Sequence, residues 1–438
     1  MFFFLRHAKF FSAFAILVIL AIILTAVLYN RSADDPWKEF KAKHGKDYEE
    51  FKDGGKEDAR RKQIFLTTDA KIKKHNSQEN VTYQLGHNKF SDMTAEELTK
   101  YLGAVEPANE NRSLPSTIRI NMTEGPLPTS LDYRTHRCLP AVKNQRNCGS
   151  CWAFSAIAPL EFAQCKKTGV PVVLSEQQLV DCDPYNSGCE GGWPTDAWDY
   201  LKYLAGGSAK QSLYPYTATE STCKYSSSMS GAKISSFGSL ATLDSINMQL
   251  GLQSYGPISV AISVAKSFFS YKSGVYNDVT CDNLGISHAV VVVGWGTLNG
   301  LNYWIVRNSW GSDWGMNGYI LIQRGVNKCK IEKHPAVIQS VIDTCQAISF
   351  IPARVSSYGS FNDPNVGYDI SPYMQAGLMG YGVISVIITI DKDSFFNYQN
   401  GVYINTACDN STDYHAIVIV GWGTDGSSGI DYWIVRNS

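Results

Sequence analysis

Four side chains suited to nucleophilic catalysis occur at three separate places in the sequence. Cys151 follows a Gly-Ser turn in QRNCGSCWAFS and opens a helical run that we predict to have its apolar residues on one face, and Gln145 begins the same stretch. At a helix N-terminus, unpaired backbone amides and the helix dipole stabilise a thiolate. His288, in SHAVVVVGWG, and Asn308, in YWIVRNSWGSDWG, come much later. A thiolate, a histidine that exchanges a proton with it, an amide that orients the histidine and an amide donor for an oxyanion are the components of acyl transfer.

Each of these signals has a simpler explanation when it is taken alone. A histidine before a run of valines is usually a core residue, Asn-Ser is usually a turn, and CGSC is also the pattern of a redox pair. Here all of them occur together, and NSWGSDWGMNGY follows the asparagine. The combination resembles the papain family of cysteine peptidases, in its cathepsin L-like branch. The resemblance covers most of residues 37–341 and returns more weakly over about 346–438.

The resemblance implies an α+β, papain-like fold with a helical lobe and a β-barrel lobe over residues 127–341. Helical patterns up to about residue 213 and β-branched runs after it agree with that layout. Cys151 would attack the scissile carbonyl as a thiolate, and His288, oriented by Asn308, would protonate the leaving amine. Gln145 and the backbone N–H of Cys151 would bind the oxyanion. Pro159 predicts a local kink in the helix that Cys151 begins. We expect no cofactor and no metal.

The family's substrate-binding positions carry over to this sequence with apolar residues around the main pocket. A Gly-Gly strip would hydrogen-bond an extended peptide, because glycine permits close approach. The pocket walls predict a hydrophobic side chain two positions upstream of the cut, and a histidine at the floor predicts some acidic character at low pH. Trp310 would also cover the His288–Asn308 hydrogen bond. These positions are Gly191, Gly192, Trp193, Pro194, Ala261, Ala289, Trp310 and His334.

Eleven cysteines without Cys/His zinc-finger spacing indicate an oxidising compartment. The resemblance pairs six of them, and we predict that Cys138 and Cys165 form a fourth bridge. Cys151 is then left as the nucleophile, so CGSC is neither a redox motif nor half of a zinc site. The three pairs that the family implies are Cys148–Cys189, Cys182–Cys223 and Cys281–Cys329.

Residues 31–126 resemble an inhibitory propeptide. A helical signature and the motif GHNKFSD stand in the family's order ahead of the catalytic cysteine, which an ordinary charged surface helix would not explain. In the family this segment runs backwards through the cleft, and acid loosens it; loss of carboxylate charge is the expected route. The enzyme would begin near residues 125–128. The two motifs comprise Glu57, Arg61, Phe65, Ile72 and Asn76, then Gly86, Asn88, Phe90 and Asp92.

The N-terminus and the composition indicate the secretory pathway. Residues 10–29 form an apolar run after Arg6 and Lys9, long enough to span a bilayer at about 20 residues. We expect residues 1–30 to be a signal anchor with the enzyme on the lumenal side, or else a cleaved signal peptide. A lysosomal or secreted location follows, with glycosylation sequons at Asn80, Asn111 and Asn121. The net charge of −1 argues against nucleic-acid binding.

The end of the chain repeats part of the barrel lobe. YGPISVAI at 255–262 returns as YGVISVII at 381–388, and HAVVVVGWGT returns as HAIVIVGWGT. His415 and Asn437 therefore correspond to His288 and Asn308, without a second glutamine or nucleophilic cysteine. We expect residues 346–438 to be a truncated duplicate, either inert or able to bind a partner or the helical lobe.

The sequence thus predicts a cysteine endopeptidase that is made as a proenzyme and acts on proteins or peptides. Its own propeptide would be its inhibitor. The alternative from another class is a catalytically silent binding or storage protein on the same fold. The presence of every catalytic residue type argues against that alternative.

Overall fold

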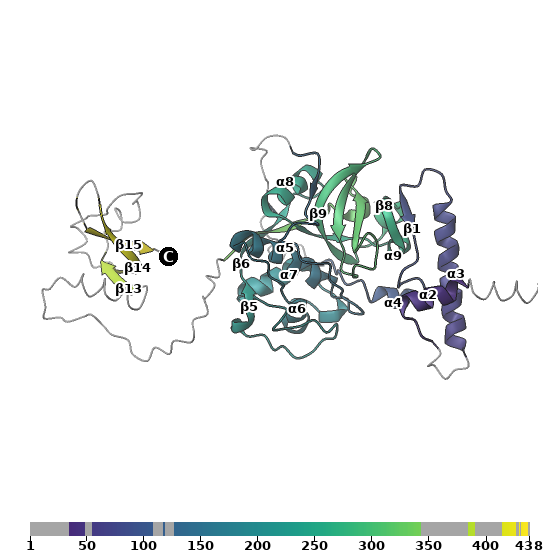
Figure 1. Cartoon of the computed structure of the whole chain (residues 1–438), viewed down its shortest axis with the longest axis horizontal. Coiled ribbons are helices and arrows are strands. Elements are labelled where there is room, and N and C mark those ends of the chain that lie inside the picture. The colour runs from purple at the N-terminus through teal and green to yellow at the C-terminus, as the bar shows by residue number, and fades with distance from the viewer. Residues whose placement is uncertain are drawn as a thin grey trace, which may run out of the picture. The chain divides into compact units, whose positions relative to one another are not determined.

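The computed structural model describes residues 35–48, 55–107, 117–118, 127–342, 384–389, 414–425, 429 and 431–436. The chain divides into two compact units, Met1–Ile348 and Ser349–Ser438, and Figure 1 labels their elements. The expected anchor, the sequons Asn111 and Asn121 and the start of the expected cleavage region lie outside the described residues. No helix within the described ranges is long and apolar enough to cross a membrane.

The described part of the first unit begins with three helices that lie together at one end of it (Figure 1). Asp35 caps the first of them by accepting the Trp37 N–H at 3.0 Å, and Gly45 ends it in the left-handed region. Trp37, Phe40 and Phe65 form a small core of their own. The three helices are α2 (Pro36–His44), α3 (Lys56–Asn76) and α4 (Ala95–Thr99).

The helical lobe is organised around α5 (Cys151–Thr168), which runs through Pro159 and ends at Gly169. One side of α5, including Trp152 and Leu160, packs in the helical core. The other side, including Phe162, packs against the sheet. The prediction of a single apolar face is therefore wrong: α5 lies between both lobes and is apolar nearly all round. The other helical turns are α6 (Glu176–Cys182), η1 (Gly188–Glu190), α7 (Pro194–Asp199) and the π-helical η2 (Tyr200–Leu204).

A ten-stranded sheet forms the second lobe, in the order β1-β8-β11-β10-β9-β7-β12-β6-β2, with β3 paired to β9. Its β-branched and aromatic residues enclose the largest core, with Trp295, Trp304 and Trp314 fully buried. The strands are β1 (Tyr83–Leu85), β2 (Thr117–Ile118), β3 (Leu131–Asp132), β6 (Ile234–Leu240), β7 (Ile258–Ile262), β8 (Tyr271–Tyr276), β9 (His288–Leu298), β10 (Leu301–Arg307), β11 (Tyr319–Gln323) and β12 (Ala336–Val341).

Shorter elements connect these parts. A two-stranded sheet pairs β4 (Ser208–Ala209) with β5 (Ser230–Ala232). The helices α8 (Ser245–Tyr255) and α9 (Lys266–Phe269) and the 3₁₀ turns η3 (Ser227–Met229), η4 (Val279–Asn283) and η5 (Lys328–Lys330) complete the unit.

The second unit contains a three-stranded antiparallel sheet, β13 (Ile384–Thr389), β14 (Tyr414–Thr424) and β15 (Asp431–Arg436). Its register matches that of β7, β9 and β10. Ile388 lies opposite His415, as Ile262 lies opposite His288. Its β14–β15 pair also has an irregularity at the place where β9 and β10 have one. The described part of the repeat thus keeps the strand pairing that the sequence similarity leads us to expect.

Candidate active site

The two lobes bring Cys151 and the first residues of β9 together. Cys151 begins α5, and its Sγ accepts the backbone N–H of Ala289 at 3.4 Å. His288, the residue before Ala289, has its Nε2 at 2.8 Å from Asn308 Oδ1. Its ring lies 4.8 Å from that of Trp310, centroid to centroid. All these side chains are buried, so the structure places the predicted nucleophile, base, orienting amide and covering indole in one site.

Gln145 faces the same site and is held by a residue that the sequence analysis missed. Its Nε2 donates to the carbonyl of Cys148 at 2.9 Å and to that of Tyr101 at 3.1 Å. The hydroxyl of Ser309 donates to its Oε1 at 2.5 Å, which turns the amide N–H₂ toward the cysteine loop. Ser309 directly follows Asn308, but nothing in its residue type signals this contact.

Residues 101–106 of the N-terminal segment lie across the catalytic residues. The carbonyl of Gly103 accepts the N–H of Gly192 at 2.9 Å, and the N–H of Val105 donates to the Gly192 carbonyl at 3.1 Å. A Cβ at Gly103 would lie 1.8 Å from the carbonyl oxygen of Gly149, so only glycine fits there. The pairing of Ala104 with Gly192 is parallel. Gly192 of the predicted strip therefore binds the chain's own backbone, and the Gly191 carbonyl accepts the N–H of Ser187 instead.

The expected side-chain pocket contains Ala104. Its methyl group packs with Cys151, Trp193, Ala261 and Ala289 in one buried cluster, because β7 and β9 pair Ala261 directly with Ala289. Two further predicted positions lie outside this cluster. Pro194 opens α7. The ring of His334 meets that of Trp193 edge-on at 5.4 Å and keeps about a third of its side chain exposed, at 34%.

A carboxylate from the N-terminal segment lies against His334. Glu106 Oε1 is 2.7 Å from His334 Nε2 and 2.6 Å from Lys333 Nζ. Desolvation lowers the pKa of His334, although hydrogen bonding to Glu106 opposes that effect. Desolvation tends to raise the pKa of Glu106, but its hydrogen bonds to Lys333 and His334 outweigh it, and the net shift is downward. Lys333 was not among the predicted site residues.

Burial beneath residues 101–106 changes the titration of the catalytic pair. Desolvation raises the pKa of the Cys151 thiol to about 12, against the lowering effect of backbone N–H groups that include those of Ala289 and Gly103. Desolvation likewise lowers the pKa of His288 to about 4, and its hydrogen bond to Asn308 opposes this only in part. The sequence alone predicted a stabilised thiolate. In the covered site the neutral thiol and neutral imidazole are favoured instead, because both charged forms lose their solvent.

Comparison with known proteins agrees with this geometry. The family described as "Papain family cysteine protease" matches residues 127–339 and 353–438. The chain is a papain-family cysteine protease. A cathepsin L-like proteinase of Fasciola hepatica is 38% identical over 322 residues, which cover 72% of this chain and 95% of that protein. The structure of digestive procathepsin L2 proteinase from the Tenebrio molitor larval midgut is 36% identical, with a TM-score of 0.64, and covers 69% of this chain and 98% of that one. The α+β two-lobe fold is therefore the papain-like fold that we expected.

This papain-family protease also carries the family's propeptide. Residues 37–98 match the "Cathepsin propeptide inhibitor domain (I29)". The chain is thus a proenzyme, and in this structure residues 101–106, which follow that match, occupy the cleft.

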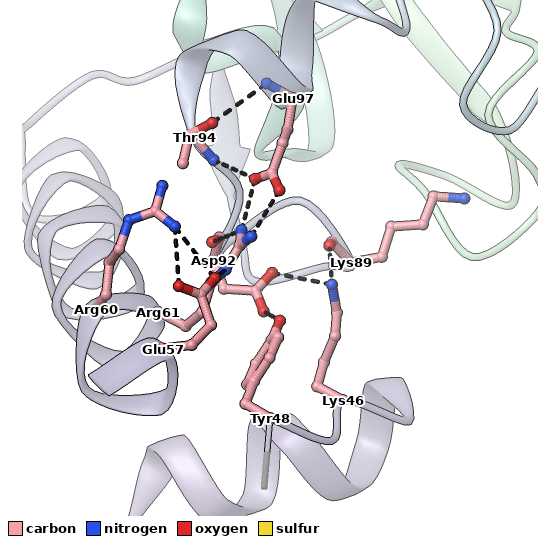
Figure 2. Close-up of polar contacts among 9 residues, drawn as sticks. All are labelled: Lys46, Tyr48, Glu57, Arg60, Arg61, Lys89, Asp92, Thr94 and Glu97. Carbon is pink, nitrogen blue, oxygen red and sulfur yellow. Dashed lines mark hydrogen bonds and ion pairs between the residues drawn. The ribbon is translucent and has the colours of Figure 1, made fainter. Parts of the chain in front are cut away.

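Two polar clusters hold the propeptide of this protease together, and Figure 2 shows both. Arg61 bridges α3 and α4: its guanidinium binds Glu57 at 2.6 Å and Glu97 at 2.5 Å. The hydrogen bond from Arg61 lowers the pKa of Glu97 to about 2. The carboxylate of Asp92, which is fully buried, accepts Lys46 Nζ at 3.0 Å and the hydroxyl of Tyr48. Both clusters contain residues of the two motifs that the sequence analysis singled out.

Four disulfides tie down the loops of the protease unit. They are the four expected pairs, Cys138–Cys165, Cys148–Cys189, Cys182–Cys223 and Cys281–Cys329. Cys151 is the free cysteine among the described residues. Cys345 and Cys408 lie outside the described residues.

Proposed function

We propose that this proenzyme yields a cysteine endopeptidase that hydrolyses peptide bonds through a thiolate–imidazolium pair. Once the cleft is open, the proton of the Cys151 thiol passes to His288, and the thiolate attacks the scissile carbonyl carbon. His288 then gives its proton to the leaving amine, and water hydrolyses the resulting thioester. Asn308 keeps the imidazole oriented, and Gln145 donates to the oxyanion. No metal or cofactor enters this scheme.

The observation that carries this proposal is the way the protease binds its own propeptide. The carbonyl of Tyr101 accepts hydrogen bonds from Gln145 Nε2 at 3.1 Å and from Trp310 Nε1 at 3.3 Å. Gly192 binds the backbone of residues 103 and 105 on both its N–H and its carbonyl. Groups suited to an oxyanion and to an extended peptide are therefore already in use, which supports a peptide substrate and a propeptide that excludes it.

The lining around Ala104 supports a preference for a hydrophobic residue two positions upstream of the cut. Trp193, Ala261 and Ala289 offer only apolar surface there, and burying a larger apolar side chain than alanine contributes about 0.8 kcal/mol per CH₂. His334, which faces Trp193, supports some tolerance of an acidic side chain at low pH, because Glu106 already binds to it.

A lysosomal or secreted location fits the four disulfides and the relatives. Disulfides of this kind form in oxidising compartments, and relatives include a digestive cysteine proteinase of Homarus americanus. We also retain the sequence-based division into propeptide (31–126), peptidase domain (127–341) and a C-terminal duplicate of part of the barrel lobe (346–438).

Labelling of the active-site thiol tests the proposed function. The full chain, brought to acid pH, should shorten at its N-terminus, cleave peptides and react with an epoxide that alkylates catalytic thiols. Cys151→Ala should remove both the labelling and the cleavage, and His288→Ala should remove the cleavage. Cleavage that persists in Cys151→Ala would refute the mechanism. His415→Ala should leave cleavage unchanged if the C-terminal repeat is inert.

A further inference from the structure

One side chain supports the strip that binds the propeptide backbone from behind, next to the backbone hydrogen bond from the Ser187 N–H to the Gly191 carbonyl at 2.8 Å. Asn186 Oδ1 accepts the backbone N–H of Trp193 at 2.6 Å, and its Nδ2 lies 3.5 Å from the carbonyl of the same residue. A Cβ at Gly192 would lie 2.2 Å from Asn186 Oδ1. The amide of Asn186 thus occupies the space directly behind the glycine that binds peptide.

Asn186 is itself held by a buried carboxylate. Its Nδ2 donates to Asp183 Oδ2 at 2.7 Å, and the other oxygen of Asp183 accepts the N–H of Tyr185 at 2.9 Å. Asp183 is 7% exposed. When it is ionised, the carboxylate of Asp183 only accepts hydrogen bonds, so it draws the amide nitrogen of Asn186 toward itself and leaves the amide oxygen toward Trp193.

The strip borders a groove on this side. Tyr185, Asn186 and Glu190 line a groove of about 270 Å³ beside residues 191–193, and Val105 and Pro107 of the propeptide border it. Removal of the propeptide takes away that border together with the backbone hydrogen bonds of Gly192. The hydrogen bond from Trp193 to Asn186 does not depend on the propeptide and remains.

We propose that Asn186 is a positioning residue for substrate, which sets the place of the Gly191–Gly192 strip and of the Trp193 wall, and that Asp183 orients Asn186. This inference rests on the proposed function, in which a substrate replaces the propeptide along the strip. Asn186 touches no reacting atom. Its loss should therefore raise KM for peptides and leave the chemistry at Cys151 unchanged.

The charged surroundings of Asp183 make a pH readout available. Burial raises the pKa of Asp183 to about 6, although hydrogen bonds from Asn186 and the Tyr185 N–H oppose it, and the charges of Asp196 and Asp199 of α7 add to the rise. Tyr200 also feels the charge of Asp183. Asn186→Asp keeps an acceptor for the Trp193 N–H but sets a second carboxylate against Asp183. Such a pair shares a proton in acid and repels when both groups are ionised.

The test uses the acid-activated full chain, with active sites counted by epoxide labelling. Asn186→Ala should raise KM about tenfold, the worth of one to two hydrogen bonds, with kcat and the rate of Cys151 alkylation by iodoacetamide unchanged. Asn186→Asp should have a KM near the wild-type value at about pH 4.5 and a KM about tenfold higher at about pH 7. Asn302→Ala, in the exposed β9–β10 hairpin where Asn302 bonds only Thr297 by its side chain, is the matched control and should change neither constant.

A second comparison separates positioning from general damage. A peptide whose N–H opposite the Gly192 carbonyl is replaced by an ester oxygen should lose about tenfold in kcat/KM with the wild-type enzyme. With Asn186→Ala the same replacement should cost less than about threefold, because the misplaced strip no longer makes that bond. An equal ester penalty in both enzymes, an unchanged KM in Asn186→Ala, or a parallel fall in alkylation rate would overturn the inference. If Asn186→Ala does not fold, the pH dependence of Asn186→Asp decides. A wild-type chain without peptidase activity would instead refute the proposed function.

Discussion

Replacing Glu106 with glutamine tests how the propeptide is fastened to the protease. The Glu106 carboxylate binds Lys333 and His334 at the edge of the Trp193 pocket, and the three side chains are 38%, 39% and 34% exposed. Pairs with that much solvent contact contribute about 0.2–1 kcal/mol each. At neutral pH the Glu106 carboxylate faces one cation, Lys333, because the pKa of His334 lies below its ordinary value of 6.5 and its ring is neutral. Glu106→Gln should then speed conversion of the proenzyme only about 1.5- to 5-fold.

The same substitution should have a larger effect in mild acid. As pH falls, His334 gains a proton while Glu106, whose pKa is lowered from 4.5, stays ionised. A second cation, protonated His334, then faces the Glu106 carboxylate. The contact between them is strongest at pH values where His334 is protonated and Glu106 is still ionised. It weakens only when pH falls through the lowered pKa of Glu106. The Glu106 contact itself is therefore strongest in mild acid, whereas the net lowering of the pKa of His334, which burial causes, acts in the opposite direction and favours release there.

Conversion of the full-length proenzyme to the mature form, followed on gels at about pH 7.5 and about pH 5, measures both effects. Glu106→Gln should accelerate conversion more at the lower pH, and His334→Gln should remove that difference while it leaves the neutral effect in place. An acceleration that is equal at the two pH values, or larger at the higher one, would refute the assigned order of protonation.

Three further predictions concern other contacts. Lys143 Nζ lies 2.6 Å and 2.7 Å from the buried carboxylates of Glu161 and Glu176. Lys143→Met should therefore lower the unfolding free energy, measured by urea titration, by about 3–5 kcal/mol. A loss below about 1 kcal/mol would contradict a buried ion cluster. Ser309→Ala should lower kcat about tenfold, less than the ~10²–10³ expected for Gln145→Ala, because it only frees the Gln145 amide to rotate; active-site titration controls for folding. The pKa of Glu97 is about 2, so its ion pair with Arg61 persists in mild acid. Arg61→Ala should therefore speed proenzyme conversion by similar factors at neutral and mildly acid pH. An effect confined to neutral pH would count against the ion pair.

The sequence motifs sufficed to predict the catalytic residues, but not the protonation state of these residues in the proenzyme. Cys151, His288, Asn308 and Gln145 meet as expected because each belongs to a long, recognisable pattern at an element's start or in a turn. The resemblance implied that the propeptide would cover the cleft, but the full burial of Cys151 could not be foreseen, since it depends on how close the Gly103 backbone comes to Gly149. A sequence carries no measure of that distance.

Contacts between single side chains were also beyond the sequence. Ser309, Lys333 and Asn186 are ordinary polar residues, and their roles arise only from the partners that the fold brings within 2.5–2.6 Å. The single apolar face expected for α5 failed for a related reason. A periodic pattern of apolar residues predicts a helix that buries one face and exposes the other. Most of α5 is buried between the two lobes, so polar residues do not define an exposed face on it.

The proton balance of the catalytic pair limits how acid can activate the protein. In the covered state the pair holds one proton, as thiol with neutral imidazole. In the active state it again holds one, as thiolate with imidazolium, so opening the cleft takes up no proton at this pair. By linkage, the equilibrium between the covered and the open cleft gains no pH dependence from Cys151 and His288. An acid trigger must then lie in groups outside this pair.

Cys151→Ala should break that balance. Without the thiol, His288 is neutral with a pKa of about 4 when covered and takes up a proton once exposed at its ordinary value of 6.5. Opening should therefore become up to about 300-fold more favourable as pH falls through this window. Hydrogen exchange at Gly103 and Val105, corrected for the intrinsic rate, reports the opening. A steeper pH dependence in Cys151→Ala than in the unprocessed wild-type chain is expected, whereas identical slopes would mean that the wild-type pair does gain a proton when the propeptide leaves.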